Sequence, residues 1–267
     1  MKVAVIGGGR MGAGIAQVFL AKGAHVTVRE PEEDAARERI ERGLRIAAGK
    51  GGLSVDQALA RLELGEVPGD AELVVEAVPE DPALKVRVLA EAEKRVGADA
   101  VLATNTSSLS VAELSAGLRR PERFVGMHFF NPVPVQKLVE IVVTPATAVL
   151  PLVRGYVELL GKTGVVINDS PGFATSRLGV LLGLEAIRMV EEGVAAPEDI
   201  DTAMTLGYGY PMGPLKLGDL VGLDVRLAIA DYLHHKLGPR FEPPRLLREM
   251  VARGELGRKS RKGFYAW

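Results

Sequence analysis

The chain of 267 residues contains no cysteine, which excludes disulfide scaffolds, thiolate catalysis and cysteine-based metal sites. It also lacks an excess of either charge, because 33 basic residues stand against 34 acidic ones. Without a positive surplus a chain has little electrostatic affinity for nucleic-acid backbones. We therefore expect no nucleic-acid partner, and any phosphate group must be held locally.

Long apolar runs are also missing. No stretch reaches the 18 apolar residues of a membrane span, and Met1 leads directly into a short apolar run rather than a charged leader. The four histidines include the neighbours His234 and His235, which cannot ligate one metal from a single helical face. We expect a cytoplasmic protein with no membrane partner and no metal site.

The periodicity of the first two thirds indicates β-strands that alternate with helices. Near-continuous apolar runs such as Val3 to Ile6 are typical of strands buried on both faces, as in a mostly parallel sheet. This predicts an α/β fold with a doubly wound, Rossmann-type sheet. The predicted strands are residues 2–6, 25–29, 73–77, 100–104, 124–129, 138–143 and 165–168.

The last third shows helical patterns only, which predicts a Rossmann-type domain over residues 1–169 and an all-α domain over residues 170–267. Apolar positions surround most of the helix expected at 173–192, so it needs cover on nearly all sides. We expect a homodimer through this C-terminal domain. Further helices are predicted at 197–206, at 214–237 with a break near 218–222, and at 243–253.

Residues of about 32–61 form a long, charged helical arm in which GKGG at 49–52 marks a turn. A minimal dinucleotide-binding domain needs only one crossover helix at this point. We expect a helix-turn-helix that projects from the sheet. Two interpretations stay open: a solvated surface helix pair, and a segment that contacts a ligand.

The first predicted strand is followed immediately by GGGRMG, the G-x-G-x-x-G pattern of dinucleotide-binding folds. In this pattern Gly7 permits a tight turn, Gly9 lets a pyrophosphate approach the backbone, and Gly12 allows close packing of helix on sheet. Met11 begins the helix, whose N-terminal amides face the phosphates. The alternative is a structural glycine turn, but the position at the first strand-to-helix junction favours a nucleotide.

Glu30 follows Gly12 by 18 residues, at the end of the second predicted strand. A carboxylate there accepts hydrogen bonds from both ribose hydroxyls and repels a 2′-phosphate, which favours NAD over NADP. The neighbouring Arg29 is the competing signal. Successive strand residues point to opposite faces, so Arg29 is expected to point away unless a turn brings it to a phosphate.

His128 and Glu140 each lie inside an apolar predicted strand, where an unpaired polar group is costly. If the two strands pair across the connection at 131–137, the two side chains become neighbours. The carboxylate then fixes the tautomer of the imidazole and stabilises its protonated form. The alternative is a buried pair that only satisfies its own hydrogen bonds.

Asn131 and the Ser107 region supply neutral hydrogen-bond donors at strand ends, where substrate oxygens would bind. The competing explanation for the serine and threonine cluster is helix capping. Ser110 and Glu113 have capping-box spacing, which leaves Ser107 without an evident structural role.

Taken together, these motifs resemble those of the L-3-hydroxyacyl-CoA dehydrogenases, including the 3-hydroxybutyryl-CoA dehydrogenases. The resemblance runs from end to end, and the HFFNPVP string is its most specific part. The segments that carry it are GGGRMGAGIA at 7–16, NTSSL at 105–109, MHFFNPVP at 127–134, GYPMGP at 209–214 and GFY at 263–265.

The resemblance implies an N-terminal NAD domain, a helical dimerisation domain and hydride transfer from C3 of a 3-hydroxyacyl-CoA of fatty acid metabolism. By this likeness His128 is the general base, Glu140 orients it, and Ser107 and Asn131 contact the reacting end of the substrate. The positions that surround NAD in the family correspond to Glu30, Glu80, Lys85, Ser107, Asn131 and Lys259.

In the family, basic groups on the arm meet the phosphates of the acyl-CoA substrate, and here Lys50, Arg42 and Arg45 are the candidates. Two hypotheses remain beside a short-chain acyl-CoA dehydrogenase. One is a dehydrogenase of a free 3-hydroxy acid of the sugar-acid type. The other is an NAD-binding protein without turnover.

Three positions depart from the family pattern. Glu30 stands where Asp is common, Ser176 where an Asn precedes the conserved arginine, and Arg261 where a glycine is usual. Ser176 matters most, because its shorter side chain cannot span the hydrogen bonds of an asparagine at a candidate substrate contact.

Overall fold

The computed structural model describes residues 1–49 and 51–267, and the chain divides into two compact units. The first unit comprises Met1–Ser170 and the second Pro171–Trp267. Each unit has its own hydrophobic core. Within the described residues, no helix has both the length and the apolar character needed to cross a bilayer.

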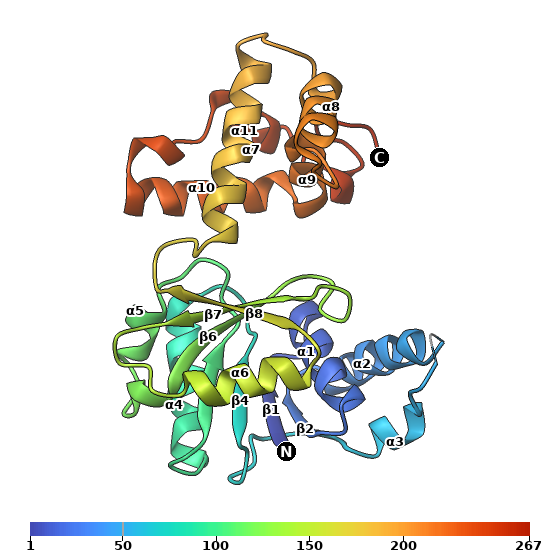
Figure 1. Cartoon of the computed structure of the whole chain (residues 1–267), viewed down its shortest axis with the longest axis vertical. Helices are drawn as coiled ribbons and strands as arrows, with labels where there is room; N and C mark the ends of the chain where they lie inside the picture. The colour runs from blue at the N-terminus through green and yellow to red at the C-terminus, as the bar shows by residue number, and fades with distance from the viewer. Residues whose placement is uncertain (50) are drawn as a thin grey trace. The chain divides into compact units, whose positions relative to one another are not determined.

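An eight-stranded sheet forms the centre of the first unit (Figure 1). Its strand order is β3-β2-β1-β4-β5-β6-β7-β8. Neighbouring strands are parallel except β6 and β7, which are antiparallel. The predicted doubly wound, mostly parallel sheet is confirmed. The strands are β1 (Lys2–Ile6), β2 (His25–Arg29), β3 (Leu62–Leu64), β4 (Leu73–Glu76), β5 (Val101–Thr104), β6 (Phe124–Phe129), β7 (Leu138–Val143) and β8 (Thr163–Asn168).

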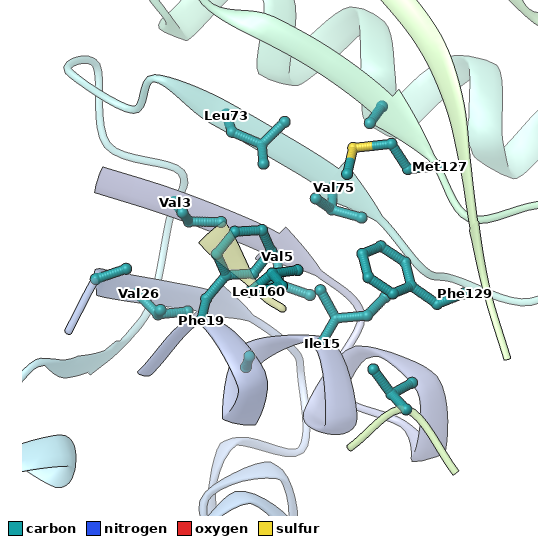
Figure 2. Packing of buried hydrophobic residues seen from close by; sticks show 14 of the residues in the cluster. Val3, Val5, Ile15, Phe19, Val26, Leu73, Val75, Met127, Phe129 and Leu160 are labelled. Atoms are coloured by element: carbon teal, nitrogen blue, oxygen red, sulfur yellow. The ribbon is translucent and has the colours of Figure 1, made fainter. Parts of the chain in front are cut away.

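Helices cover both faces of the central strands, whose residues are buried on both sides, whereas the edge strand β8 is largely exposed. On one face, Ile15 and Phe19 of α1 pack against Val3 and Val5 of β1, beside β4 (Figure 2). On the other face, α4 packs on β4 and β5. Helix α6 packs against β7 and β8 and contributes Val153 and Val157 to the core of this unit. The α-helices of the sheet domain outside the charged arm are α1 (Arg10–Ala21), α4 (Pro82–Arg95), α5 (Val111–Ser115) and α6 (Leu150–Leu159).

The arm consists of α2 (Glu33–Ala48) and α3 (Val55–Leu59) and leads into β3. One face of α2 packs against α1, and its buried members are Ala36, Ile40 and Leu44. The strand β3 was missing from the sequence prediction, because three residues are too few to establish a period. The arm therefore serves as the crossover between the parallel strands β2 and β3.

The second unit is built from helices, as predicted. Its longest helix, α7 (Thr175–Glu191), lies within the predicted range 173–192. The predicted break near Gly222 separates two helices, and Gly222 adopts a positive φ of 107° there. The other helices are α8 (Pro197–Tyr208), α9 (Pro214–Val221), α10 (Leu223–Leu237) and α11 (Arg245–Ala252).

The buried carboxylates of Asp201 and Asp219 accept hydrogen bonds from the C-terminal residues 264–267 and so hold this segment against the helices. Asp219 of α9 accepts hydrogen bonds from the amides of Phe264 and Tyr265 at 3.0 and 2.9 Å, and from Nε1 of Trp267 at 2.9 Å. Asp201 of α8 accepts from the hydroxyl of Tyr265 at 2.8 Å, and burial raises the pKa of that phenol. The turn that carries Lys259 is thereby held against the helices.

Candidate active site

The candidate site residues of the first unit lie along one edge of the sheet. The neighbours β2, β1, β4, β5 and β6 are mutually parallel, so their carboxyl ends meet at the same edge. Reading along this edge, Glu30 comes first, followed by the glycine loop at 7–12, the loop at 77–80, Ser107 and finally His128. Ligands of open α/β sheets bind at this edge, where the strand order reverses between β1 and β4.

The glycine loop meets the packing requirements of a dinucleotide site. Gly7 has a φ of 100°, and a Cβ added to it would lie 2.7 Å from the carbonyl oxygen of Ala77. A Cβ at Gly12 would lie 1.7 Å from the carbonyl oxygen of Gly7. Packing within the chain therefore requires glycine at positions 7 and 12, but it does not require glycine at position 9.

Gly9 has an ordinary φ of −66°, and a Cβ added to it would meet no atom within 4 Å. Neither strain nor packing within the chain explains a glycine there. It fits the close approach of a pyrophosphate to the backbone, next to the first amides of α1. The loop therefore fits NAD, with Met11 in the first turn of the helix.

Gly9→Ala is expected to weaken NADH binding about tenfold or more, which corresponds to about 1.4 kcal/mol of lost interaction. The melting temperature should change little, because the added methyl group enters open space. Fluorescence titration with NADH and thermal unfolding without ligand measure the two effects. Gly12→Ala is the contrasting control, since its methyl group clashes with the backbone and should lower both the NADH affinity and the melting temperature. Unchanged NADH affinity in Gly9→Ala would contradict the assignment of the loop.

Glu30 and Arg29 point in different directions at the end of β2. Oε2 of Glu30 accepts a hydrogen bond of 2.6 Å from the amide of Gly8, which ties this carboxylate to the glycine loop. Arg29 forms ion pairs with Glu66 at 3.4 Å and with Glu91 at 3.0 Å. The anionic side chain thus lies at the glycine loop, and the cationic one is occupied elsewhere.

Glu30→Ala should weaken NAD binding by about ten- to a hundredfold, because a charge-assisted hydrogen bond contributes roughly 1.5 to 3 kcal/mol. The preference for NADH over NADPH should narrow with it, since the repulsion of a 2′-phosphate is lost. Comparing kcat/KM with the two cofactors measures this. Glu63→Ala, on the adjacent strand β3, provides an exposed control. Equal kinetics with NADPH in the unmutated protein would refute the NAD preference.

His128 and Glu140 are brought together by the antiparallel pairing of β6 and β7, in which they occupy directly opposed positions. Nδ1 of His128 lies 2.7 Å from Oε2 of Glu140, and both side chains are buried. The prediction that they are neighbours is confirmed. A carboxylate only accepts hydrogen bonds, so Nδ1 carries the proton and the lone pair belongs to Nε2. The ring also contacts Phe130, with centroids 4.4 Å apart.

Ser107 has a structural partner, contrary to the expectation that it lacked one. Its amide donates to Oε1 of Glu80 at 2.9 Å, and its hydroxyl lies 3.4 Å from the same oxygen. Oε2 of Glu80 forms an ion pair of 3.2 Å with Nζ of Lys85. Three candidate cofactor residues are therefore joined. The expected capping bond is present too, from the amide of Glu113 to Ser110 at 3.1 Å.

Sequence reasoning did not select two members of this cluster, Glu76 and Thr104. Both are fully buried at the ends of β4 and β5, and they are bonded to each other. Glu76 follows an apolar strand run, which is the same signal that identified Glu140. Thr104 offers no comparable signal, because threonine is common in strands.

Asn131 is exposed in the loop between β6 and β7, where it precedes the cis-proline Pro132. The loop is anchored by Lys162, whose Nζ donates to the carbonyl oxygen of Val133 at 2.6 Å and to that of Gln136. Burial lowers the pKa of Lys162. Val133 packs against Gly14 of α1, so a Cβ at Gly14 would come within 2.9 Å of it. Asn131 is thus carried by a loop attached to the cofactor-binding helix.

The remaining candidates lie outside this cluster. Ser176 is half-buried in the first turn of α7, and Lys259 pairs with Asp224 at 2.5 Å, both in the second unit. Lys50 lies outside the described residues. Arg42 and Arg45 are exposed on α2 and line a shallow depression there, in which Arg45 pairs with Glu41.

The fold and the glycine loop define a dinucleotide-binding Rossmann domain, and comparison with known families shows that it belongs to an NAD-dependent oxidoreductase. Residues 2–170 match the family model described as "3-hydroxyacyl-CoA dehydrogenase, NAD binding domain". Residues 172–267 match the model "3-hydroxyacyl-CoA dehydrogenase, C-terminal domain". The chain belongs to the 3-hydroxyacyl-CoA dehydrogenase family.

The similarity to named relatives covers essentially the whole chain. A 3-hydroxybutyryl-CoA dehydrogenase of Mycobacterium tuberculosis is 44% identical over 100% of this chain and 98% of its own length. The human mitochondrial hydroxyacyl-coenzyme A dehydrogenase is 40% identical over 99% of this chain and 90% of its own. The crystal structure of (S)-3-hydroxybutyryl-CoA dehydrogenase from Ralstonia eutropha matches with a TM-score of 0.94 and 37% identity, over 100% of this chain and 98% of that one. A diketoreductase structure, described in terms of substrate-directed dual catalysis of dicarbonyl compounds, matches with a TM-score of 0.87 and 28% identity, over 100% of this chain and 99% of that one.

Proposed function

We propose that this dehydrogenase interconverts short-chain L-3-hydroxyacyl-CoA, with 3-hydroxybutyryl-CoA as the leading substrate, and 3-oxoacyl-CoA. His128 acts as the general base and Glu140 as its orienting partner. The observation that carries the proposal is the 2.7 Å contact between Nδ1 of His128 and Oε2 of Glu140, buried at the ligand-binding edge of an NAD domain. The names of the relatives give the substrate class.

The proposed chemistry follows from the hydrogen bond. With the Nδ1 proton held by Glu140, Nε2 of His128 accepts the proton of the substrate hydroxyl as the hydride leaves. The imidazole becomes a cation, and the adjacent carboxylate stabilises that charge. When bound, NAD supplies the hydride acceptor. We assign Ser107 and Asn131 to contacts with the reacting end of the substrate.

The proposed acyl-CoA substrate gives the arm a role. CoA carries phosphates far from the reacting carbon, and the exposed Arg42 and Arg45 offer cationic groups at the surface of α2. We assign the CoA phosphates to these residues, together with Lys50. Binding energy from this remote part helps hold the 3-hydroxyl at His128, so a truncated substrate loses rate as well as affinity.

The second candidate is a dehydrogenase of free 3-hydroxy acids, supported by Ser176 and by the similarity to the diketoreductase. Steady-state kinetics with NADH and either acetoacetyl-CoA or acetoacetate separates the two. We expect kcat/KM to be higher for the thioester by about a hundredfold or more, because the CoA contacts are lost in the free acid. A higher kcat/KM for acetoacetate would overturn the proposal.

The Ser176→Asn variant tests the weakest part of the substrate assignment. If the family's asparagine is needed at the thioester end, this variant should speed the reduction of acetoacetyl-CoA. The substitution should leave acetoacetate kinetics unchanged, which makes the free acid a built-in control.

We also propose a homodimer through the C-terminal unit. Leu178 and Leu181 on α7 are 68% and 36% exposed, and apolar area left in water costs about 25 cal/mol per Å². A second copy of this helix would cover them. Light scattering at micromolar concentration should report a dimer, and Leu178→Glu should weaken it. A fully active monomer would contradict the assignment.

A further inference from the structure

A buried ion pair lies beneath the ligand-binding edge, between β4 and α4. Nζ of Lys85 donates to Oε1 of Glu76 at 2.7 Å, and the two side chains are 1% and 0% exposed. Oε2 of Glu76 accepts from the hydroxyl of Thr104 at 2.6 Å. Removing two charges from water is costly, so a buried pair is weak evidence for stability and calls for another explanation.

The pair determines the shape of the loop at 77–80. Oε1 of Glu76 accepts a hydrogen bond of 2.7 Å from the amide of Val78, and Nζ of Lys85 donates to the carbonyl oxygen of Val78 at 3.2 Å. Both polar ends of this residue's backbone are therefore held by the pair. The loop leads directly to Glu80, and its first residue, Ala77, packs on Gly7.

Lys85 extends the same network toward the surface. Its Nζ lies 3.2 Å from Oε2 of Glu80. The other carboxylate oxygen of Glu80 accepts from Thr106 Oγ1 and from the amide of Ser107. Glu80 is 38% exposed at its side chain, so the network passes from a buried carboxylate to an accessible one.

The position of Glu80 and Ser107 along the ligand-binding edge indicates which part of the cofactor lies beside them. Glu30 marks the adenosine side at β2, the glycine loop at β1 receives the pyrophosphate, and His128 lies on β6. The loops after β4 and β5 lie between the glycine loop and His128. This is the interval that the nicotinamide half of the cofactor must occupy to meet the reacting carbon.

We propose that Glu76 is a positioning residue for the nicotinamide half of NAD. Its charge holds Lys85 in place, Lys85 holds Glu80, and Glu80 holds the backbone at Ser107. The inference rests on the cofactor contacts of Glu80 and Ser107 that the family resemblance implies, and it does not depend on which substrate the enzyme takes.

Glu76→Gln and the double variant Glu76→Gln/Lys85→Met test this. Glutamine keeps the shape of Glu76 and removes its charge, which leaves Lys85 without its main counter-ion and lowers the melting temperature. The double variant removes both charges, so its melting temperature should recover toward the wild-type value. We expect NADH to bind about tenfold more weakly to both variants, because the ammonium group that pairs with Glu80 loses its anchor at Glu76 in the first and is absent from the second.

ADP distinguishes a positioning role at the nicotinamide half from a general structural role, which would weaken the binding of ADP and NADH alike. It carries the adenosine and the pyrophosphate but no nicotinamide ribose, so its dissociation constant should stay unchanged in both variants. Glu93→Gln is the matched control. Glu93 lies on α4, the helix that carries Lys85, and is 5% exposed. Its carboxylate accepts hydrogen bonds from the backbone amides of Arg119 and Arg120. This control should lower the melting temperature without altering NADH binding.

NADH affinity within twofold of wild type in the double variant overturns the proposal, as does a parallel loss of ADP and NADH binding. Weak NADH binding with a recovered melting temperature and normal ADP binding supports it. All these measurements omit substrate, so they are unaffected if the acyl-CoA assignment fails.

Discussion

His128→Gln is expected to lower kcat by about 10²- to 10⁴-fold, the usual contribution of a general base. Glutamine approximates the size of histidine but takes up no proton at neutral pH. NADH affinity should remain close to the wild-type value, since His128 lies on β6, away from the glycine loop after β1. Steady-state kinetics and NADH fluorescence titration measure the two quantities.

The same substitution at His25 serves as the matched control. His25 is exposed at the start of β2, at the opposite end of that strand from Glu30. His25→Gln should leave kcat unchanged. A His128→Gln enzyme with normal turnover would remove the general-base assignment, whereas a loss of NADH binding in it would indicate a role in the cofactor site instead.

Glu140→Gln is expected to lower kcat by a comparable factor, about 10²-fold or more, through a different cause. The amide has nearly the same shape as the carboxylate, so the site stays filled. Its charge is gone, however, and its NH₂ group can face Nδ1 of His128 and select the other tautomer. The proton of Nδ1 and the stabilisation of the imidazolium are then both lost.

The double variant His128→Gln/Glu140→Gln separates an orienting carboxylate from an independent contributor. If Glu140 acts only through His128, the double variant should be no slower than His128→Gln alone. A multiplicative loss would mean that Glu140 contributes to catalysis by a separate route. Circular dichroism and thermal unfolding show whether each variant keeps the fold.

Much of the sheet and of the His128 pair was predictable from the sequence, because the signals involved are local. Apolar runs of four to six residues mark strands, and the bounds of β1, β2, β6 and β7 match those predicted from such runs. The glycine pattern is a string of six consecutive residues, so it can be recognised in the sequence without knowledge of any tertiary contact. His128 and Glu140 are joined by a single short connection, so pairing of the two strands was enough to bring them together.

Interactions between distant elements could not be read from the sequence. The strand β3 has only three residues and exists because β2 offers it an edge. The Glu76 network depends on Thr104, 28 residues away, and Asp219 binds Trp267 across 48 residues. A buried carboxylate at a strand end indicates that hydrogen-bond donors or a counter-ion must lie beside it, since desolvation of an unpaired charge is costly. Local sequence thus determined which elements form and where polar groups are buried, and the tertiary structure alone decided which distant donors satisfy them.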